Sequence, residues 1–154
     1  VRFAGLHCYH GAAQHLRAPA ERAMAIASAT AAVRAAKSSV ARAGLDADIV
    51  TGAGTGTWML ERDSGVWNEL QPGSYPFMDA DYARNAPGPR DVAFEHSLFV
   101  WTTVMSRTRA DTAIVDAGLK ASSIDSGMPR VAVLLLLTAP LFGLVQRWRR
   151  HPER

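Results

Sequence analysis

Cysteine is almost absent from this 154-residue sequence, which contains only Cys8. A single cysteine excludes an internal disulfide, and it offers no paired thiolates at metal-ligand spacing. Lysine is scarce as well, since only Lys37 and Lys120 are present. No secretory leader precedes the first apolar run. We therefore expect a reducing, cytoplasmic setting.

The body of the chain lacks net charge. In the last eight residues, four arginines outnumber one acid, Glu153, and this excess equals the whole formal charge of +3. Taking these residues away from the 17 basic and 14 acidic residues of the chain leaves thirteen of each. Nucleic-acid backbones are bound through clustered positive charge. The sequence therefore predicts no nucleic-acid partner.

The first half of the sequence alternates strand-like and helix-like segments. An apolar run over residues 1–9 predicts a buried strand, and short strands are predicted over 48–50 and 66–70. Between them, Pro19 opens an alanine-rich segment that Gly44 is placed to end. Apolar residues recur there at three- and four-residue steps, which predicts a helix with one buried face: Ile26, Ala29, Val33, Ala36 and Val40. This rhythm is typical of an α/β parallel-sheet unit.

The pattern changes after Pro87-Gly88-Pro89. Residues 94–106 and 112–120 are rich in β-branched and aromatic types, and no helical pattern separates them. Two such runs predict antiparallel strands of a second domain that begins near residue 90.

An apolar run over residues 131–145 precedes the terminal arginines. It is shorter than the roughly 20 residues that a helix needs to span a bilayer, and Pro140 and Gly143 weaken it further. Three interpretations stay open: weak membrane contact with the C-terminus on the cytoplasmic side, a core strand, and an out-of-frame tail.

Two loops rich in glycine and hydroxyl groups follow predicted strands: TGAGTGT at 51–57 and QPGSY at 71–75. Glycine lets the backbone approach a phosphate, and Thr55 and Ser74 can donate N–H and hydroxyl hydrogen bonds. Loops from neighbouring parallel strands could clasp a single phosphate. Either motif alone could also be an ordinary tight turn.

A dinucleotide fingerprint starts with similar glycines but does not fit. After Gly52 and Gly54, the third glycine comes at Gly56, one residue too early. No long amphipathic helix follows over 58–65, and no strand ending in an acid appears about twenty residues later. The sequence does not predict a dinucleotide site.

Polar residues beside these loops are further candidates. Strand alternation places His7 and Tyr9 on one face and Cys8 on the other. Asp79 and Asp81, in MDADY, could form a carboxylate pair, but their spacing before a loop favours capping and turn roles.

The sequence resembles D-threonine aldolases and the related D-serine dehydratases in five segments, taken in order: YHGAAQHLR, TGAGTGT, ELQPGSYPFMDADYARN, EHSLFVWTTVMSR and DAGLKASSIDSG. These are pyridoxal-phosphate enzymes with an alanine-racemase-like barrel followed by a β domain. The resemblance covers about residues 1–129. It implies part of a (β/α) barrel of alanine-racemase type over 1–89, the start of a β domain over 90–129, and a divergent apolar and basic tail over 130–154.

The resemblance also implies which residues bind pyridoxal phosphate. Four would hold the phosphate, one would lie near the pyridine nitrogen, and one of two would lie near the ring: Gly54, Thr55, Gly73 and Ser74, then Gln71, then Tyr9 or His10. A neutral amide at the pyridine nitrogen would leave the ring unprotonated, which affects how well it withdraws electrons.

The implied activity is retro-aldol cleavage of D-β-hydroxy amino acids to glycine and an aldehyde, and D-serine dehydration is the alternative. The family's imine-forming lysine and divalent-metal ligands have no counterpart here, because Lys37 falls in the predicted helix and Lys120 in the predicted β domain. We therefore expect an incomplete, inactive copy, a fragment without catalytic or metal-binding residues of its own. A non-catalytic cofactor-binding or scaffold remnant is a second alternative, and homo-oligomer formation stays open.

Overall fold

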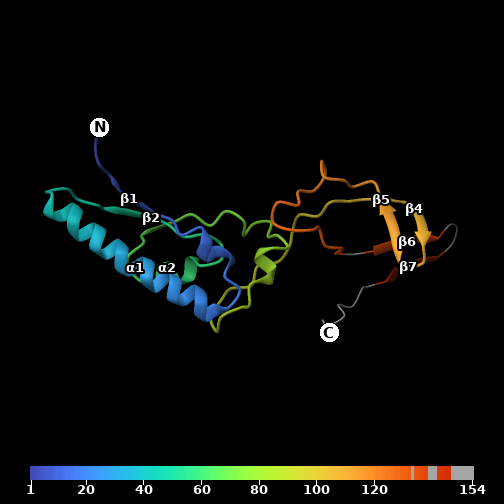
Figure 1. Ribbon diagram of the computed structural model, residues 1–154, viewed down its shortest axis with the longest axis horizontal. Helices are drawn as coiled ribbons and strands as arrows, with labels where there is room; N and C mark the ends of the chain where they lie inside the picture. Colours follow the sequence, from blue (N-terminus) through green and yellow to red (C-terminus); the bar gives the residue numbers. More distant parts are fainter. Residues whose placement is uncertain (133, 139–141, 147–154) are drawn as a thin grey trace. The chain divides into compact units, whose positions relative to one another are not determined.

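The computed structural model describes residues 1–132, 134–138 and 142–146 (Figure 1). The chain divides into two compact units, residues 1–98 and 99–154. The sequence placed the start of the second domain near residue 90. In the structure, residues 90–98 are grouped with unit 1.

A three-stranded parallel sheet forms the centre of unit 1. Its strands lie in the order of the chain: β1 (Gly5–Cys8), β2 (Ile49–Gly52) and β3 (Glu69–Leu70). Their last residues, Cys8, Gly52 and Leu70, are neighbours in register. Because parallel strands end at the same edge, the loops after β2 and β3 lie next to each other. The predicted α/β class with a parallel sheet is confirmed.

The long helix α1 (Pro19–Arg42) begins and ends where the sequence predicts. Pro19 occupies the first helical turn, where its missing N–H costs nothing. At the other end Gly44 has a φ of +75°. The amides of Gly44 and Leu45 donate to the carbonyls of Ala41 and Val40, a Schellman motif that satisfies the last carbonyls of the helix.

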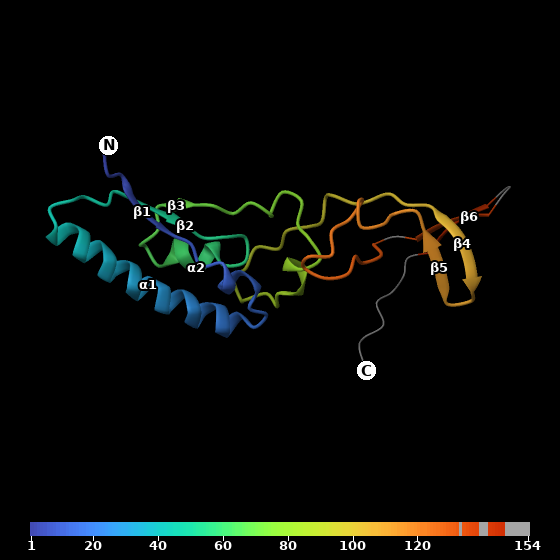
Figure 2. The same ribbon diagram turned by 45° about the horizontal axis from the view of Figure 1, so that its top comes forward.

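One face of α1 packs on the sheet, as Figure 2 shows. Val33 of the helix, Val50 of β2 and Trp67 form the buried cluster, and Cys8, Ala29, Val66 and Leu70 pack around it. The Trp67 indole N–H also donates to the carbonyl of Cys8, at 3.0 Å. This packing ties α1, β1 and the segment before β3 into one body. The predicted burial of Ile26 and Val33 is confirmed.

Short helices complete unit 1: η1 (Ala12–His15), α2 (Trp58–Asp63) and η2 (Tyr82–Arg84). They follow or connect the strands at the end of the sheet where the loops lie. Segments far apart in the sequence are therefore brought together there.

The strand predicted to begin at Phe94 begins ten residues later. β4 spans Val104–Arg109, and residues 94–103 have no regular secondary structure. The amide and hydroxyl of Ser97 donate instead to the carbonyls of Phe77 and Pro76. These bonds hold residues near 97 to unit 1 and outweigh their strand propensity.

Unit 2 consists of antiparallel strand pairs. β4 pairs with β5 (Thr112–Val115) in an irregular register, and β6 (Leu134–Thr138) pairs with β7 (Phe142–Gln146). The sequence predicted antiparallel strands in the runs 94–106 and 112–120, and the antiparallel pairing is confirmed for β4 and β5, which overlap these runs in part. Strands also lie in the apolar run 131–145, in agreement with the strand interpretation of the tail. None of the described helices is both long and apolar enough to cross a membrane.

Candidate functional site

The loop after β2 makes a tight turn that is buried from its first residues. Ala53 is fully buried and has a φ of +68°, a left-handed conformation that is unusual for alanine. The carbonyl of Gly54 then accepts hydrogen bonds from the amides of Thr57 and Trp58. A Cβ atom at Gly54 would lie 2.4 Å from Oε1 of Gln14 and 2.8 Å from the hydroxyl of Tyr9, so a larger residue here would displace these two side chains.

The loop after β3 meets the first loop directly. The backbone amide of Gln71 donates to the Gly52 carbonyl, which extends the strand pairing by one residue. The Ser74 amide then donates to the Thr55 hydroxyl, at 3.1 Å. The two predicted glycine-rich loops are therefore joined by a hydrogen bond between them.

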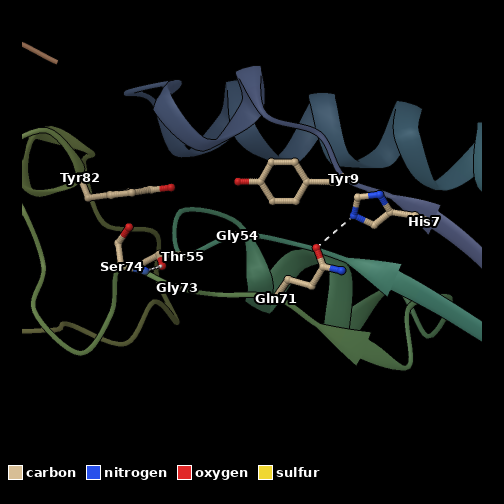
Figure 3. A pocket seen from close by; sticks show the side chains of 8 residues that line it. All are labelled: His7, Tyr9, Gly54, Thr55, Gln71, Gly73, Ser74 and Tyr82. Atoms are coloured by element: carbon tan, nitrogen blue, oxygen red, sulfur yellow. Dashed lines mark hydrogen bonds between the residues drawn. The ribbon is translucent and has the colours of Figure 1, made fainter. Parts of the chain in front are cut away.

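A cavity of about 360 Å³ opens between these loops and the end of β1. Figure 3 shows the side chains and glycines that line it: His7, Tyr9, Gly54, Thr55, Gln71, Gly73, Ser74 and Tyr82. Among the described residues, the lining contains hydroxyl, amide and imidazole groups but no carboxylate, lysine or arginine. A cavity of this kind can bind an anionic group through neutral donors without repelling it.

The structure brings together six of the seven residues that the sequence singled out. His10 is the exception: it does not belong to the cavity lining, and its carbonyl accepts a hydrogen bond from the Gln14 side chain. His7 and Tyr82 line the cavity without having been predicted as site residues. Strand alternation already placed His7 beside Tyr9, but Tyr82 comes from a loop whose position no local pattern indicates.

Two tyrosine hydroxyls point toward each other across the cavity (Figure 3). Burial, the neighbouring Tyr9 and Asp79, and a hydrogen bond with Tyr9 raise the pKa of Tyr82 to about 12, although a hydrogen bond with Ser74 opposes the shift. The Tyr82 phenol therefore stays protonated near neutral pH. It can donate a hydrogen bond to an anion in the cavity.

Gln71 is held by contacts on both sides. Nε2 of His7 lies 3.1 Å from Oε1 of Gln71, a hydrogen bond in which the imidazole donates (Figure 3). The Gln71 amide nitrogen donates to the Thr51 hydroxyl, at 2.8 Å. These two bonds fix the orientation of the neutral Gln71 side-chain amide beside the cavity.

The two aspartates of MDADY anchor Tyr82 instead of forming a catalytic pair. Oδ1 of Asp79 accepts the amides of Asp81 and Tyr82, which confirms the predicted turn role for Asp79. The Asp81 side chain does not cap η2, so that part of the prediction is wrong. The Asp81 carboxylate, which is largely buried, pairs with His15 at 2.6 Å and with Arg17 at 2.5 Å. The His15 ring also contacts the Tyr82 ring, with centroids 5.2 Å apart. These contacts fix the loop that carries Tyr82.

The pKa values of two carboxyl groups near the site, buried Glu61 and partly buried Asp81, shift in opposite directions. Burial raises the pKa of Glu61 above its ordinary value of 4.5, against hydrogen bonds from the Thr57 hydroxyl and the Glu61 backbone. Burial also acts to raise the pKa of Asp81, but hydrogen bonds from Arg17 and His15 and their positive charges lower it below 3.8 overall. Folding therefore favours protonated Glu61 and ionised Asp81.

We expect Glu61→Gln to remove a pH dependence of stability. A raised pKa means that the contribution of Glu61 to the free energy of unfolding is complete below pH 4.5 and falls as the pH rises through the folded pKa. The contribution of Asp81 is already complete above pH 3.8 and stays constant in this window. Urea denaturation from pH 4.5 upward should show the fall in the wild type and not in the variant. Parallel pH profiles would contradict this prediction.

Neither lysine lies at the cavity. Lys37 is half-buried on α1, and Lys120 is exposed in unit 2. In the part of the chain that the structure describes, no group of three or more His, Cys, Asp or Glu residues could hold a metal ion.

Comparisons with known proteins agree with one another. A family model described as a putative serine dehydratase domain matches residues 97–150, beyond residue 129 where the resemblance was expected to end. A 3-hydroxy-D-aspartate aldolase of Paracoccus denitrificans (strain Pd 1222) is 45% identical over 135 residues, which cover 85% of this chain and 35% of that protein. A D-threonine aldolase of Arthrobacter sp is 45% identical over 132 residues, which cover 85% of this chain and 34% of that protein.

A solved structure has the same fold at high sequence identity. The crystal structure of D-threonine aldolase from Filomicrobium marinum superposes with a TM-score of 0.78 at 50% identity, and the match covers 90% of this chain and 38% of that one. The chain thus spans about a third of the length of the curated relatives it matches.

Proposed function

Because this chain belongs to the D-threonine aldolase and D-serine dehydratase-like family, we propose that it forms the phosphate-binding part of a pyridoxal-phosphate lyase. The substrates would be D-β-hydroxy amino acids, cleaved between Cα and Cβ to glycine and an aldehyde. The three parallel strands would then be consecutive strands of a (β/α) barrel of alanine-racemase type, with the site at their carboxyl ends.

The observation that carries this proposal is the junction of the two loops. The Ser74 amide reaches the Thr55 hydroxyl across the gap between neighbouring strands, so both loops border the same cavity. Gly73 is exposed and has open space at its Cβ position, so the backbone is accessible there. A phosphate group needs such a concave cluster of N–H and hydroxyl donors.

The residues present fit a cofactor phosphate in charge and in space. No acidic side chain of the part that the structure describes lines the cavity, and a Cβ atom added at Gly73 meets no heavy atom within 4 Å. Gly54, Thr55, Gly73 and Ser74 would bind the phosphate oxygens, with Tyr82 as an additional hydroxyl donor. Tyr82, which was not among the predicted site residues, is thus added to the proposed phosphate ligands.

The remaining lining residues would position the pyridine ring. Gln71, held by His7 and Thr51, would place its amide near the ring nitrogen. Tyr9 would lie beside the ring. When bound, pyridoxal phosphate supplies the electron-withdrawing group that allows a bond at Cα to break. A neutral amide at the nitrogen would keep this withdrawal moderate, since it does not protonate the ring.

A specific observation favours each of two alternatives. The family model that matches residues 97–150 is described as a putative serine dehydratase domain, which favours dehydration of a D-β-hydroxy amino acid with release of ammonia. The absence of a lysine from the described cavity lining favours a chain that binds the cofactor without catalysis. Measuring glycine and ammonia release from D-threonine and D-serine separates these functions.

We expect the 154-residue chain to bind pyridoxal phosphate through its phosphate. Equilibrium dialysis should show saturable binding that inorganic phosphate competes away. Pyridoxal, which lacks the phosphate, should bind at least about tenfold more weakly, or about 1.4 kcal/mol. We expect no glycine release above the buffer rate, because neither lysine of the chain lies at the cavity. Equal affinity for the two compounds, or no binding, would refute the proposed site.

A further inference from the structure

A row of buried polar side chains lies behind the loop that follows β2. Gln14 of η1 and Glu61 of α2 are each 1% exposed, and Thr57 between them is 3% exposed. None of the three lines the cavity. Burying polar groups is unfavourable unless they bond to one another, so their arrangement is constrained by their hydrogen bonds.

The three side chains form a continuous chain of hydrogen bonds that ends on the loop backbone. The Thr57 hydroxyl donates to Oε1 of Glu61, at 2.9 Å. The Gln14 amide nitrogen donates to the Thr57 hydroxyl oxygen, at 2.7 Å. The Gly56 amide donates to Oε1 of Gln14, at 3.0 Å. Glu61 is thereby connected to the backbone of the loop that lines the cavity.

Glu61 determines which atom donates and which accepts in each of these hydrogen bonds. A hydroxyl has one proton, and Oε1 of Glu61 accepts it from Thr57. The Thr57 oxygen is then free to accept from the NH₂ end of Gln14, which turns the Gln14 carbonyl oxygen toward the Gly56 amide. The other carboxyl oxygen, Oε2, is buried and has no hydrogen-bond partner among the described residues. A proton bound there would leave Oε1 as the acceptor, so the direction is the same in both protonation states.

Gln14 also packs directly against the neighbouring glycine. A Cβ atom at Gly54 would lie 2.4 Å from Oε1 of Gln14. The same oxygen therefore bonds to Gly56 and supports Gly54. Thr55, which lines the cavity and accepts the Ser74 amide, lies between these two glycines. Displacement of the Gln14 oxygen would shift the backbone on both sides of Thr55.

We propose that Glu61 is a positioning residue which, through Thr57 and Gln14, fixes the backbone of residues 54–56 in the geometry that binds a phosphate monoester. This inference rests on the proposed function, because it concerns the same cavity. It assigns a role to buried residues that do not touch the ligand themselves.

The test compares two substitutions of Thr57, the middle residue of the hydrogen-bond chain. Thr57→Val removes the hydroxyl at nearly unchanged volume, and Thr57→Ser keeps it. Affinities for pyridoxal phosphate and for pyridoxal are measured on the 154-residue chain, together with thermal melting. We expect Thr57→Val to weaken pyridoxal phosphate binding about tenfold, leaving pyridoxal binding within about twofold. Thr57→Ser should keep the wild-type preference for the phosphorylated compound.

Each outcome has a defined meaning. If the wild type does not prefer pyridoxal phosphate, the proposed function fails. If the wild type has this preference and Thr57→Val retains it, or if Thr57→Ser loses it equally, the positioning role of Glu61 is overturned.

Amide hydrogen exchange of the wild type gives a test that does not depend on a variant folding. The Gly56 amide should exchange at least about 100-fold more slowly than the exposed Gly73 amide, since it is bonded to a buried acceptor. Equal exchange rates at the two glycines would overturn the inference even if Thr57→Val does not fold.

Discussion

Replacing Gly73 with valine is expected to reduce the affinity for pyridoxal phosphate at least about 100-fold, or about 2.8 kcal/mol, without lowering the melting temperature. Gly73 lines the cavity, and an added Cβ atom there meets nothing within 4 Å. The branched side chain therefore fits the fold but occupies space that the phosphate needs. Equilibrium dialysis and a thermal melt of the same sample measure the two effects separately.

The matched control for this variant is Gly118→Val. Gly118 also has open space around its Cβ position, but it belongs to unit 2 and does not line the cavity. Its substitution should leave cofactor affinity unchanged. Unchanged affinity in Gly73→Val would refute the assignment of the phosphate site to these two loops.

Replacing Arg22 with methionine should destabilise unit 1 by about 3 kcal/mol. Arg22 is only 3% exposed. Its guanidinium donates to the carbonyls of Leu16, Arg17 and Ala86 and to the Asp91 carboxylate. Methionine retains much of the apolar stem but supplies no donor, so the Leu16 and Ala86 carbonyls lose the guanidinium. The Arg17 carbonyl keeps the Ala86 amide as a donor. Helix α1 would also lose its ion pair with Asp91.

Arg34→Met provides the control for this prediction. Arg34 lies on the same helix, is exposed, and donates only to the Ser64 carbonyl. Loss of the Arg34 guanidinium should change the free energy of unfolding by less than about 0.5 kcal/mol, as expected for an exposed polar contact. Urea denaturation at neutral pH measures both variants. Similar effects of the two substitutions would show that burial of the Arg22 guanidinium does not contribute to stability.

These two variants separate binding from folding. Gly73 affects the space available to a ligand, whereas Arg22 holds together the segments that carry the site. A loss of cofactor affinity in Gly73→Val at full stability would therefore identify the cavity as the binding site. The same loss in Arg22→Met would be accompanied by a lower free energy of unfolding.

Several features were predictable from the sequence because their causes are local. Pro19 and Gly44 define the ends of α1 through the missing N–H of proline and the positive φ of glycine. Glycine and hydroxyl residues directly after strand-forming runs identify both loops. Alternation along β1 places Tyr9 toward the cavity. In each of these cases the residues involved are close together in the sequence.

Strand propensity alone gave a wrong start for the β region. Residues 94–103 carry the β-branched and aromatic types of a strand, but Ser97 bonds to the turn that contains Phe77. Those partners are about twenty residues earlier in the chain. A pattern within the segment cannot indicate them.

By itself, the sequence determined the parallel α/β class, the position of α1 and the two loops that border the cavity. Only the tertiary structure decided that Tyr82 completes the lining and that Gln14 and Glu61 support the first loop. Gln14 lies more than forty residues from Thr57 in the chain. Such contacts depend on how the strands align, since register places the ends of β1, β2 and β3 side by side.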